Sequence, residues 1–428
     1  MAQQAGKILP VTPLERPAFW ATFLGWGLDG FDYMMYTLVL AAVIGAFHLT
    51  DASAGFLGTA TLVMSAVGGI LAGTISDRVG RVKMLVFAVL VYSVFTALSG
   101  IATSYGEMLV FRGMEGLGFG GEWAVGAVLI SETVRGDLRG RILGIVQGAW
   151  AFGWALAVIA SDLILPHAGA AGWRIMFFIG ILPAVSVFYI LKRVPEPKLW
   201  TAESHQKKAT RSSVSFFKIF ERPVLRRTTF AALLAVGAQS GYYAIFTWLP
   251  TYLKIDRHLS VVGSSGYLFV VIVGSFLGYV VSGYVNDWLG RKGAFFVYSI
   301  CSGLIILLYT HFSISDAVMI LLSFPLGFFA SGIFSGFGPF FAELFPTEYR
   351  GAGQGFAYNF GRGIAGFAPF FVGLLAVHFG LAGGISIFGP ASYLLCIISL
   401  LFLPETRGID LATIGTGPRQ RAVGAKGE

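Results

Sequence analysis

The sequence predicts an all-α integral membrane protein with twelve transmembrane helices in two pseudo-symmetric bundles of six. Three observations lead to this fold class: the composition, the number of long apolar runs and an internal repeat. Of the 428 residues, 56% are hydrophobic and only 12% are charged, about half the charged share of a soluble domain. Such a chain cannot cover a water-facing surface with polar groups, so lipid must be its solvent.

Twelve apolar runs are long enough to cross a bilayer. The one long polar segment between runs follows the sixth and is rich in Lys, Arg and Ser. We therefore expect an N-terminal bundle over 1–192, a linker over 193–226, a C-terminal bundle over 227–403 and a tail over 404–428. The runs are 18–47, 53–76, 83–103, 106–131, 140–165, 172–192, 227–253, 262–285, 293–312, 316–340, 351–377 and 381–403.

The positive charges predict the orientation. With the N-terminus inside, 25 of the 30 Lys and Arg residues fall in inside segments, and only Arg174, Lys254 and Arg257 fall outside. This asymmetry places both termini and the linker in the cytoplasm. The expected location is the plasma membrane, in particular the inner membrane of a bacterium.

Other classes of protein find no support in the sequence. The net charge of +8 arises from short basic segments between apolar runs, without the aromatic and basic interleaving of a nucleic-acid interface. Cys301, Cys396 and the six histidines show no metal-ligand spacing. No nucleotide loop or nucleophile constellation indicates an enzyme, and we expect no metal or other cofactor.

The internal repeat supports the two bundles. Gly73, Asp77, Gly80 and Arg81 recur 210 residues later, and Glu132, Arg139, Gly140 and Gly144 recur 211 residues later. The segments after the sixth and the twelfth run both begin with Pro-Glu, at 195–196 and 404–405. Two repeated halves of six spans are typical of secondary transporters. GxxxG pairs, among them 116/120 and 274/278, predict close helix packing in both halves.

These motifs resemble a known family. The segment G-x3-D-R-x-G-R at 73–81, FRGMEGLGFGGEW at 111–123 and PETRG at 404–408 are similar to signatures of the major facilitator superfamily. The Asp-x-x-Asp of the first span and YNFGRG at 358–363 resemble its proton-linked carriers of organic acids, both the aromatic-acid group and the lactate/sialate group. The resemblance implies alternating access. It also implies that the loop residues act as a gate on the cytoplasmic side: Asp77, Arg81, Asp287 and Arg291.

Asp29 and Asp32 lie inside the first apolar run and share one helix face. The equivalent positions of the second half, Gln239 and Tyr242, are polar but uncharged. Because a carboxylate at mid-membrane costs a few kcal/mol, such a group is protonated or paired. We predict that these aspartates couple transport to protons. The alternative is that one of them only pairs with Arg112.

The fourth run carries Arg112, Glu115 and Glu122 on one helical face, without charged counterparts in the tenth run. Glu115 and Glu122 are further candidates for proton coupling. Arg112 either binds substrate or forms a structural ion pair, and both interpretations stay open.

Arg362 lies near the middle of the eleventh run, where the first half has Ala151. A permanent cation that forks two donors suits a carboxylate substrate, although pairing with Asp29 or Asp32 is the alternative. We expect the substrate site to contain Arg362 and ten further residues: Asn359, Tyr358, Arg112, Gln147, Gln239, Tyr242, Tyr243, Trp26, Tyr33 and Tyr36.

The predicted function is uptake of a small organic anion, such as a monocarboxylate or aromatic acid, by proton symport. The expected partners are that anion, the proton and the bilayer, with no nucleic acid, and the protein is expected to act as a monomer. Three alternatives remain: an acidic-sugar symporter, a proton-driven efflux antiporter and, from a different class, a nutrient sensor with a transporter fold.

Overall fold

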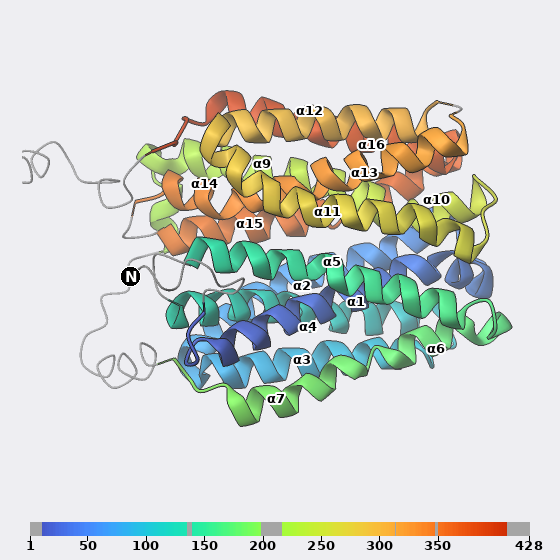
Figure 1. Cartoon of the computed structure of the whole chain (residues 1–428), viewed down its shortest axis with the longest axis horizontal. Helices are drawn as coiled ribbons and strands as arrows, with labels where there is room; N and C mark the ends of the chain where they lie inside the picture. The colour runs from blue at the N-terminus through green and yellow to red at the C-terminus, as the bar shows by residue number, and fades with distance from the viewer. Residues whose placement is uncertain (1–10, 135–138, 198–215, 313, 347–349, 409–428) are drawn as a thin grey trace, which may run out of the picture.

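The computed structural model describes residues 11–134, 139–197, 216–312, 314–346 and 350–408, and regular structure in these segments is helical (Figure 1). The N-terminal half contains α1 (Arg16–Phe47), α2 (Asp51–Val79), α3 (Arg81–Ser99), α4 (Tyr105–Thr133), α5 (Arg139–Ile164), η2 (Gly169–Ala171), α6 (Gly172–Ile179), η3 (Leu182–Val185) and α7 (Ser186–Arg193). The C-terminal half contains η4 (Phe216–Phe220), α9 (Arg222–Phe246), α10 (Leu249–Ile255), α11 (Val261–Leu289), α12 (Arg291–Thr310), α13 (Asp316–Gly332), η5 (Ile333–Gly336), α14 (Phe337–Leu344), α15 (Arg350–Ala365) and α16 (Ala368–Phe402).

Each predicted span lies on one helix or on consecutive helical segments. Within the described residues, ten segments are long and apolar enough to cross a membrane by length and composition. Helix α4 is not among them because it carries Arg112, Glu115 and Glu122 in its interior. The segment 352–402 contains two of the predicted spans, which separate at Gly380, where a φ of 70° interrupts the helix. The twelve predicted spans are thus all present as helix.

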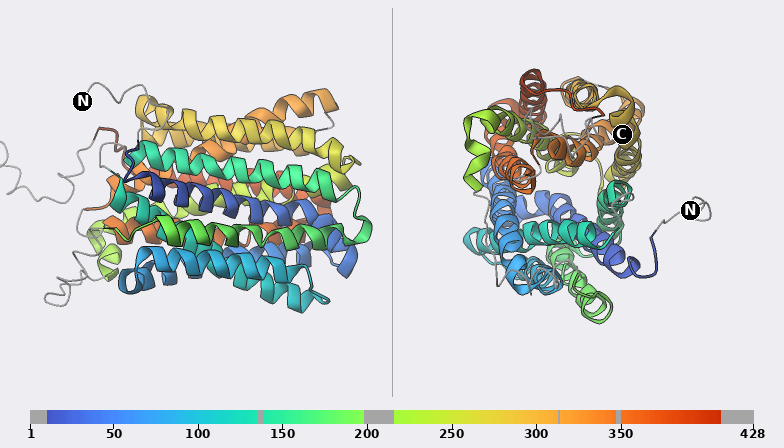
Figure 2. Two further views of the ribbon diagram at one scale, coloured as in Figure 1. Left: turned by 60° about the horizontal axis from the view of Figure 1, so that its bottom comes forward. Right: turned by 90° about the vertical axis from the view of Figure 1, so that its left-hand side faces the viewer.

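The two halves of the chain lie side by side, with their long helices roughly parallel. Figure 1 shows the N-terminal helices (blue to green) together and the C-terminal helices (yellow to red) together. The end-on view in Figure 2 shows the same two groups. We call the end at which α1 begins and α16 finishes the basic end, since Arg81 and Arg291 lie there at the starts of α3 and α12.

The internal repeat extends to the helix caps at the opposite end. The hydroxyl of Thr50 accepts a hydrogen bond from Ser53 N at the start of α2, and that of Ser260 accepts one from Gly263 N at the start of α11. Ser104 and Ser315 cap α4 and α13 in the same way. Each hydroxyl satisfies a backbone N–H that the helix itself leaves free.

The predicted GxxxG packing is confirmed for the pairs 116/120 and 274/278, one in each half, whereas a methyl group at Gly73 or Gly355, in the predicted pairs 69/73 and 351/355, would meet nothing within 4 Å. On α4, a methyl group at Gly116 would lie 2.2 Å from Thr61 O, and one at Gly120 would lie 1.7 Å from Ser65 O. On α11, a methyl group at Gly274 would lie 2.1 Å from Phe324 O. These backbones approach closely because the glycines have no side chain.

The predicted polar linker ends in folded structure. Its residues 198–215 lie outside the described part, but η4 packs against α9, where the Thr228 hydroxyl donates a 2.6 Å hydrogen bond to Ile219 O. Ile219 is fully buried. Helix α9 starts at Arg222, five residues before the predicted start of the seventh span.

Candidate functional site

The loop between α2 and α3 is held by contacts within the N-terminal half. Arg81 Nη2 lies 3.0 Å from Glu132 Oε1 of α4. The Glu196 carboxylate accepts hydrogen bonds from the backbone N–H groups of Arg81 and Val82, at 2.8 and 3.1 Å. The side chain of Asp77, a predicted gate residue, lies outside the described part of the structure.

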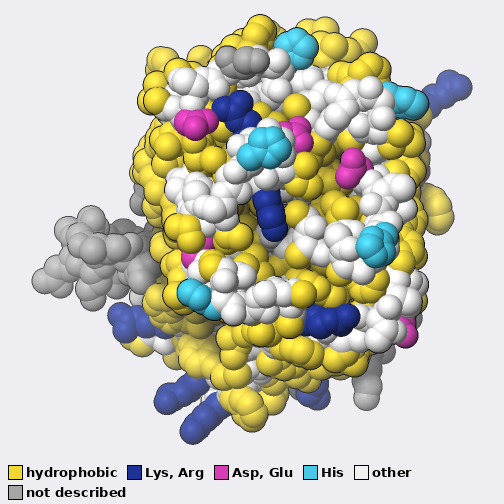
Figure 3. Space-filling view, turned by 90° about the vertical axis from the view of Figure 1, so that its right-hand side faces the viewer, with side chains coloured by type: hydrophobic (Ala, Val, Ile, Leu, Met, Phe, Trp, Pro, Cys, Tyr) yellow, Lys and Arg dark blue, Asp and Glu magenta, His cyan; other side chains and the backbone are white. Residues whose placement is uncertain are grey.

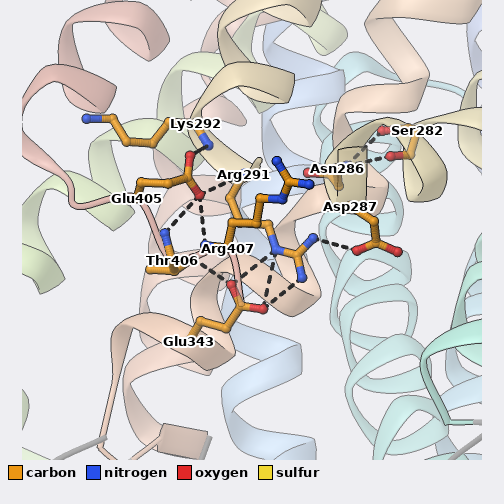
Figure 4. Close-up of polar contacts among 9 residues, drawn as sticks. All are labelled: Ser282, Asn286, Asp287, Arg291, Lys292, Glu343, Glu405, Thr406 and Arg407. Carbon is orange, nitrogen blue, oxygen red and sulfur yellow. Dashed lines mark hydrogen bonds and ion pairs between the residues drawn. The ribbon is translucent and has the colours of Figure 1, made fainter. Parts of the chain in front are cut away.

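The equivalent loop between α11 and α12 repeats this arrangement (Figure 4). Arg291 Nη2 lies 2.9 Å from Glu343 Oε1, and its Nη1 lies 2.8 Å from Asp287 Oδ1. The Glu405 carboxylate accepts hydrogen bonds from the N–H groups of Arg291 and Lys292, at 2.9 and 3.0 Å. Since these partners all lie in the C-terminal half, the contacts stabilise that half internally. A gate role for Arg81, Asp287 and Arg291 stays a prediction.

Backbone hydrogen bonds change the acidity of Glu405, which lies outside the membrane-spanning segments. Partial burial raises its pKa, but hydrogen bonds from four backbone N–H groups favour the charged form more strongly. The net result is a pKa below the ordinary value for glutamate. Glu405 is therefore ionised at neutral pH and caps the start of α12.

Deep in the N-terminal half, Arg112 lies in a cluster that contains its own ion-pair partner, although its Nε and Nη2 atoms have no hydrogen-bond partner among the described residues. Its Nη1 forms a short ion pair with Glu115 one turn later on α4, and its guanidinium carbon lies 4.2 Å from the centre of the Tyr36 ring. Asp32 Oδ2 accepts a 3.0 Å hydrogen bond from the Thr96 hydroxyl of α3. We call Asp32, Thr96, Arg112 and Glu115 the Arg112 cluster. Its cation has a carboxylate partner in its own half, as a structural ion pair requires.

A second group of carboxyls lies one turn away on α1 and two turns away on α4, and is arranged differently. The carboxyl groups of Asp29 and Glu122 are electrostatic neighbours and are fully buried. The two carboxyl groups lie within hydrogen-bond reach of each other, and none of their four oxygens accepts a fully formed hydrogen bond from another described residue. A methyl group at Gly25 would lie 2.1 Å from Glu122 Oε1, so this glycine leaves the space that Glu122 occupies against α1.

Arg362 of α15 reaches this carboxyl pair from the other half. Only 2% of its surface is exposed, and Asp29, Tyr243 and Tyr358 are its electrostatic neighbours. Its guanidinium carbon lies 4.7 Å from the centre of the Phe119 ring of α4. Within the described residues it forms no ion pair, and its Nε and Nη1 atoms have no hydrogen-bond partner. We call Asp29, Glu122 and Arg362 the Asp29 cluster.

Aromatic rings pack around Phe119, the ring that lies against Arg362, and cross between the halves. Trp150 Nε1 of α5 donates a 3.0 Å hydrogen bond to the Tyr242 hydroxyl of α9. The Tyr33 hydroxyl lies 3.0 Å from Thr247 Oγ1, and its ring centre lies 5.9 Å from that of Tyr243. The ring of Trp26 lies 4.9 Å from that of Trp150. A planar apolar group beside Arg362 would therefore meet ring faces from both halves.

The remaining residues of the predicted substrate site are placed less favourably for contact with a substrate. Asn359 Nδ2 donates to Gly355 O of its own helix. Gln239 Nε2 donates to Tyr358 O at 3.1 Å, which leaves its Oε1 without a partner among the described residues. Gln147 Oε1 is likewise buried without a described partner. The Tyr36 hydroxyl donates to Ala54 O, and its ring covers Arg112, so this residue belongs to the Arg112 cluster.

The two halves touch at mid-depth and at the end opposite the basic end. There, the Ser265 hydroxyl of α11 donates a short hydrogen bond to Asp162 of α5. A methyl group at Gly55 of α2 would lie 2.3 Å from Pro369 O of α16. On the outer face of this end, charged side chains of both signs are scattered among hydrophobic ones (Figure 3).

Toward the basic end the same helices separate. A methyl group at Gly69 would lie 3.1 Å from Asn359 Oδ1, whereas one at Gly73, a turn closer to the basic end, would meet nothing within 4 Å. On α5, a methyl group at Gly148 would lie 3.3 Å from Phe276, whereas one at Gly144 would again meet nothing within 4 Å. At these two positions the contact between the halves ends before the basic end is reached.

Three residues in or beside these clusters were not predicted from the sequence: Thr96, Tyr92 and Phe119. Each looks like an ordinary core residue of an apolar span. Phe119 lies within FRGMEGLGFGGEW, one turn before Glu122. Its position on the same helix face as Glu122 could have identified it as a neighbour of the site. Tyr92 and Thr96 have no comparable signal, because only the packing of α3 places them beside the aspartates of α1.

Comparison with known proteins agrees with this architecture. The family model described as "Major Facilitator Superfamily" matches residues 22–366 and 268–423. A probable 4-methylmuconolactone transporter of Cupriavidus pinatubonensis is 38% identical over 405 residues, which cover 94% of each chain. A sialic acid transporter of Escherichia coli is 31% identical over 379 residues, 88% of this chain and 91% of the relative.

A solved structure shares the fold. The xylose transporter of E. coli, in a partially occluded inward open conformation, superposes with a TM-score of 0.74 at 18% identity. The match covers 94% of this chain and all of the other.

Proposed function

This multi-pass membrane protein belongs to the major facilitator superfamily, and on that premise we propose that it is a proton-coupled symporter that takes up a small organic anion. Its relatives include a sialic acid transporter and a probable 4-methylmuconolactone transporter, and its fold is that of a transporter rather than an enzyme. The observation that carries the proposal is Arg362. It is a buried cation without an ion pair in the described structure, and it lies where the halves meet.

A substrate carboxylate would supply the partner that Arg362 lacks. A guanidinium presents paired donors in the geometry of a carboxylate, and burial strengthens the contact. The Phe119 ring already packs against one face of the guanidinium. The aromatic rings of Tyr33, Trp150 and Tyr243 favour a substrate with a planar apolar part. Arg112 is less suited to this role, because Glu115 neutralises it.

The proton would bind to the Asp29–Glu122 pair. Two adjacent carboxyls in a low-dielectric interior do not both ionise readily, so the pair retains a proton until a cation approaches. When a substrate anion occupies Arg362, the aspartate loses that neighbouring positive charge and takes up a proton. Asp32 and Glu115 are weaker candidates, since Thr96 and Arg112 already hydrogen-bond them.

Alternating access would use the two halves as moving units, with the predicted boundaries 1–192 and 227–403 and the linker 193–226 between them. The distribution of Lys and Arg supports a cytoplasmic basic end, in a bacterial inner membrane. The described structure would then be open toward the cytoplasm. We propose that a monomer suffices and that the proton gradient is the only energy source.

Uptake into proteoliposomes tests the proposal. The purified full-length protein is reconstituted, an inside-alkaline pH gradient is imposed, and radiolabelled benzoate, nicotinate, sialic acid and 4-methylmuconolactone are offered in turn. We expect at least one compound to accumulate above its outside concentration, and a protonophore to abolish the accumulation. Accumulation only under the reversed gradient would indicate an antiporter. Facilitated exchange without any response to either gradient would contradict proton coupling.

A second candidate, an acidic-sugar symporter, is supported by the sialic acid transporter among the relatives. The same assay separates the two, because accumulation of sialic acid but of neither benzoate nor nicotinate would favour it.

A further inference from the structure

Helix α3 presents two hydroxyl groups, one turn apart, to the two aspartates of α1. Thr96 donates a hydrogen bond to Asp32. Tyr92 lies one turn earlier on α3, and its electrostatic neighbours are three carboxyls: Asp29, Asp32 and Glu122. The Tyr92 side chain is 1% exposed; its hydroxyl makes no fully formed hydrogen bond with a described residue, but the Asp29 carboxyl lies close enough to accept a weak one. A buried phenol without a partner costs free energy unless a neighbouring group accepts its hydrogen bond in some state of the protein.

The packing of Tyr92 keeps it beside these carboxyls. A methyl group at Gly118 of α4 would lie 2.5 Å from Tyr92 N and 2.9 Å from Tyr92 Cβ. Helices α3 and α4 therefore pack backbone to backbone at this depth, and both belong to the N-terminal half. Tyr92 moves with Asp29 and Glu122, whereas Arg362 belongs to the other half.

The groups that face Asp29 come from several helices. Glu122 lies on α4, Asp32 on α1 itself, Tyr92 on α3 and Arg362 on α15. Helix α5 meets α1 here through Ala149 and Trp150, which do not titrate. Of these groups, Tyr92 and Arg362 keep their hydrogen-bond donors throughout, whereas Glu122 and Asp32 can donate to an ionised carboxylate only while they are protonated.

We propose that Tyr92 is a positioning residue for the coupling reaction: its hydroxyl donates a hydrogen bond to Asp29 when Asp29 is ionised, and so weakens the hold of the Asp29–Glu122 pair on a proton. The inference rests on the proposed function, since it assigns the residue that adjusts the proposed proton site. The phenol keeps its own proton throughout. It stabilises the charge that remains after the transported proton leaves, as a donor to a carboxylate does.

The test uses the carboxylic C=O stretching band in the infrared spectrum of the full-length purified protein, titrated with pH and without any substrate. Asp29→Asn identifies the part of the band that belongs to the pair. Tyr92→Phe keeps the ring and removes the donor. The matched control is Tyr393→Phe, because Tyr393 is also 1% exposed with an unpartnered hydroxyl, but its neighbours are Ser302 and Cys396 rather than carboxyls.

We expect Tyr92→Phe to move the midpoint of the band upward by about one pH unit, the amount that corresponds to one hydrogen bond to a charged acceptor. Tyr393→Phe should leave it unchanged. 3-Fluorotyrosine at position 92 is a stronger donor and should move the midpoint downward, which provides a second variant if Tyr92→Phe fails to reach the membrane.

Two results would overturn the inference in distinguishable ways. If Asp29→Asn removes the band component while the position-92 variants titrate like wild type, Tyr92 is a packing residue and the proposed proton site stands. If Asp29→Asn changes neither the band nor gradient-driven uptake, the proton site itself is wrong, and the role of Tyr92 is lost with it.

Discussion

The two buried arginines allow a prediction that separates binding from stability. Arg112 has an ion-pair partner one turn away on its own helix, whereas Arg362 has none among the described residues. We expect Arg362→Ala to weaken substrate binding about 10- to 150-fold. This range follows from the roughly 1.5–3 kcal/mol of a hydrogen bond to a charged group. Arg362→Lys should also bind poorly, because an ammonium does not present the planar fork.

Arg112→Ala serves as the matched comparison. It would leave Glu115 as a buried, uncompensated charge, which costs about 3–5 kcal/mol of folding stability. Its main effect should therefore be a lower melting temperature, and Glu115→Gln in the same chain should restore part of the loss. Arg362→Ala should melt close to wild type, since no described carboxylate is paired with it.

The assay measures two quantities on each purified variant: the melting temperature, and the Kd for the acid that the uptake screen identifies. The reasoning is refuted if Arg362→Ala binds that acid with wild-type Kd. It is also refuted if Arg362→Ala melts far below wild type and Asp29→Asn rescues it, because Arg362 would then be the structural partner of Asp29.

Three further predictions follow from the geometry. Gly25→Ala should displace the Glu122 carboxyl and reduce gradient-driven accumulation at least tenfold, while Gly45→Ala on the same helix, where a methyl group meets nothing within 4 Å, should transport like wild type. Asp162→Ala removes a hydrogen bond that joins the halves at the end opposite the basic end, so cysteines placed there should react faster with a membrane-impermeant maleimide; unchanged labelling would mean that this contact does not hold the end closed. Glu405→Ala should lower the free energy of unfolding by about 1 kcal/mol, as loss of a helix cap does. Because the folded pKa of Glu405 is lowered, its contribution is present above the unfolded pKa and declines as the pH falls through the folded value, so wild type and mutant should converge in melting temperature in acid.

The fold could be predicted from the sequence because the bilayer imposes a simple rule on each span. Apolar runs of sufficient length are visible without knowledge of tertiary contacts, and the repeat identified both loops in which Arg81 and Arg291 pair with Glu132 and Glu343. The charged members of the site were found for a similar reason, since an intramembrane charge is rare enough to stand out.

The division of these charges into two clusters could not be predicted. The pairing of Arg112 with Glu115 rather than with Asp32 depends on side-chain geometry within α4 and on the position of α3. The mid-span depth of Asp32 and its uncharged counterpart Tyr242 favour Asp32 as a proton carrier when the sequence alone is considered. The structure favours Asp29 as the proton carrier instead. The Thr96 hydroxyl already donates a hydrogen bond to Asp32, whereas no described residue donates a fully formed hydrogen bond to Asp29.

The two clusters together have an electrical consequence. Among the described residues at mid-depth, four buried carboxyls accompany two buried guanidinium groups. Two protons therefore make the empty interior electrically neutral, and a low-dielectric region strongly favours that state. A monocarboxylate that enters with one further proton leaves the interior neutral, so one such transport cycle moves no net charge and membrane voltage neither drives nor opposes it. A dicarboxylate would need two further protons for the same balance. With only one proton, each cycle would carry a net negative charge into the cell. The membrane potential would oppose that movement by roughly 2.3 kcal/mol for every 100 mV.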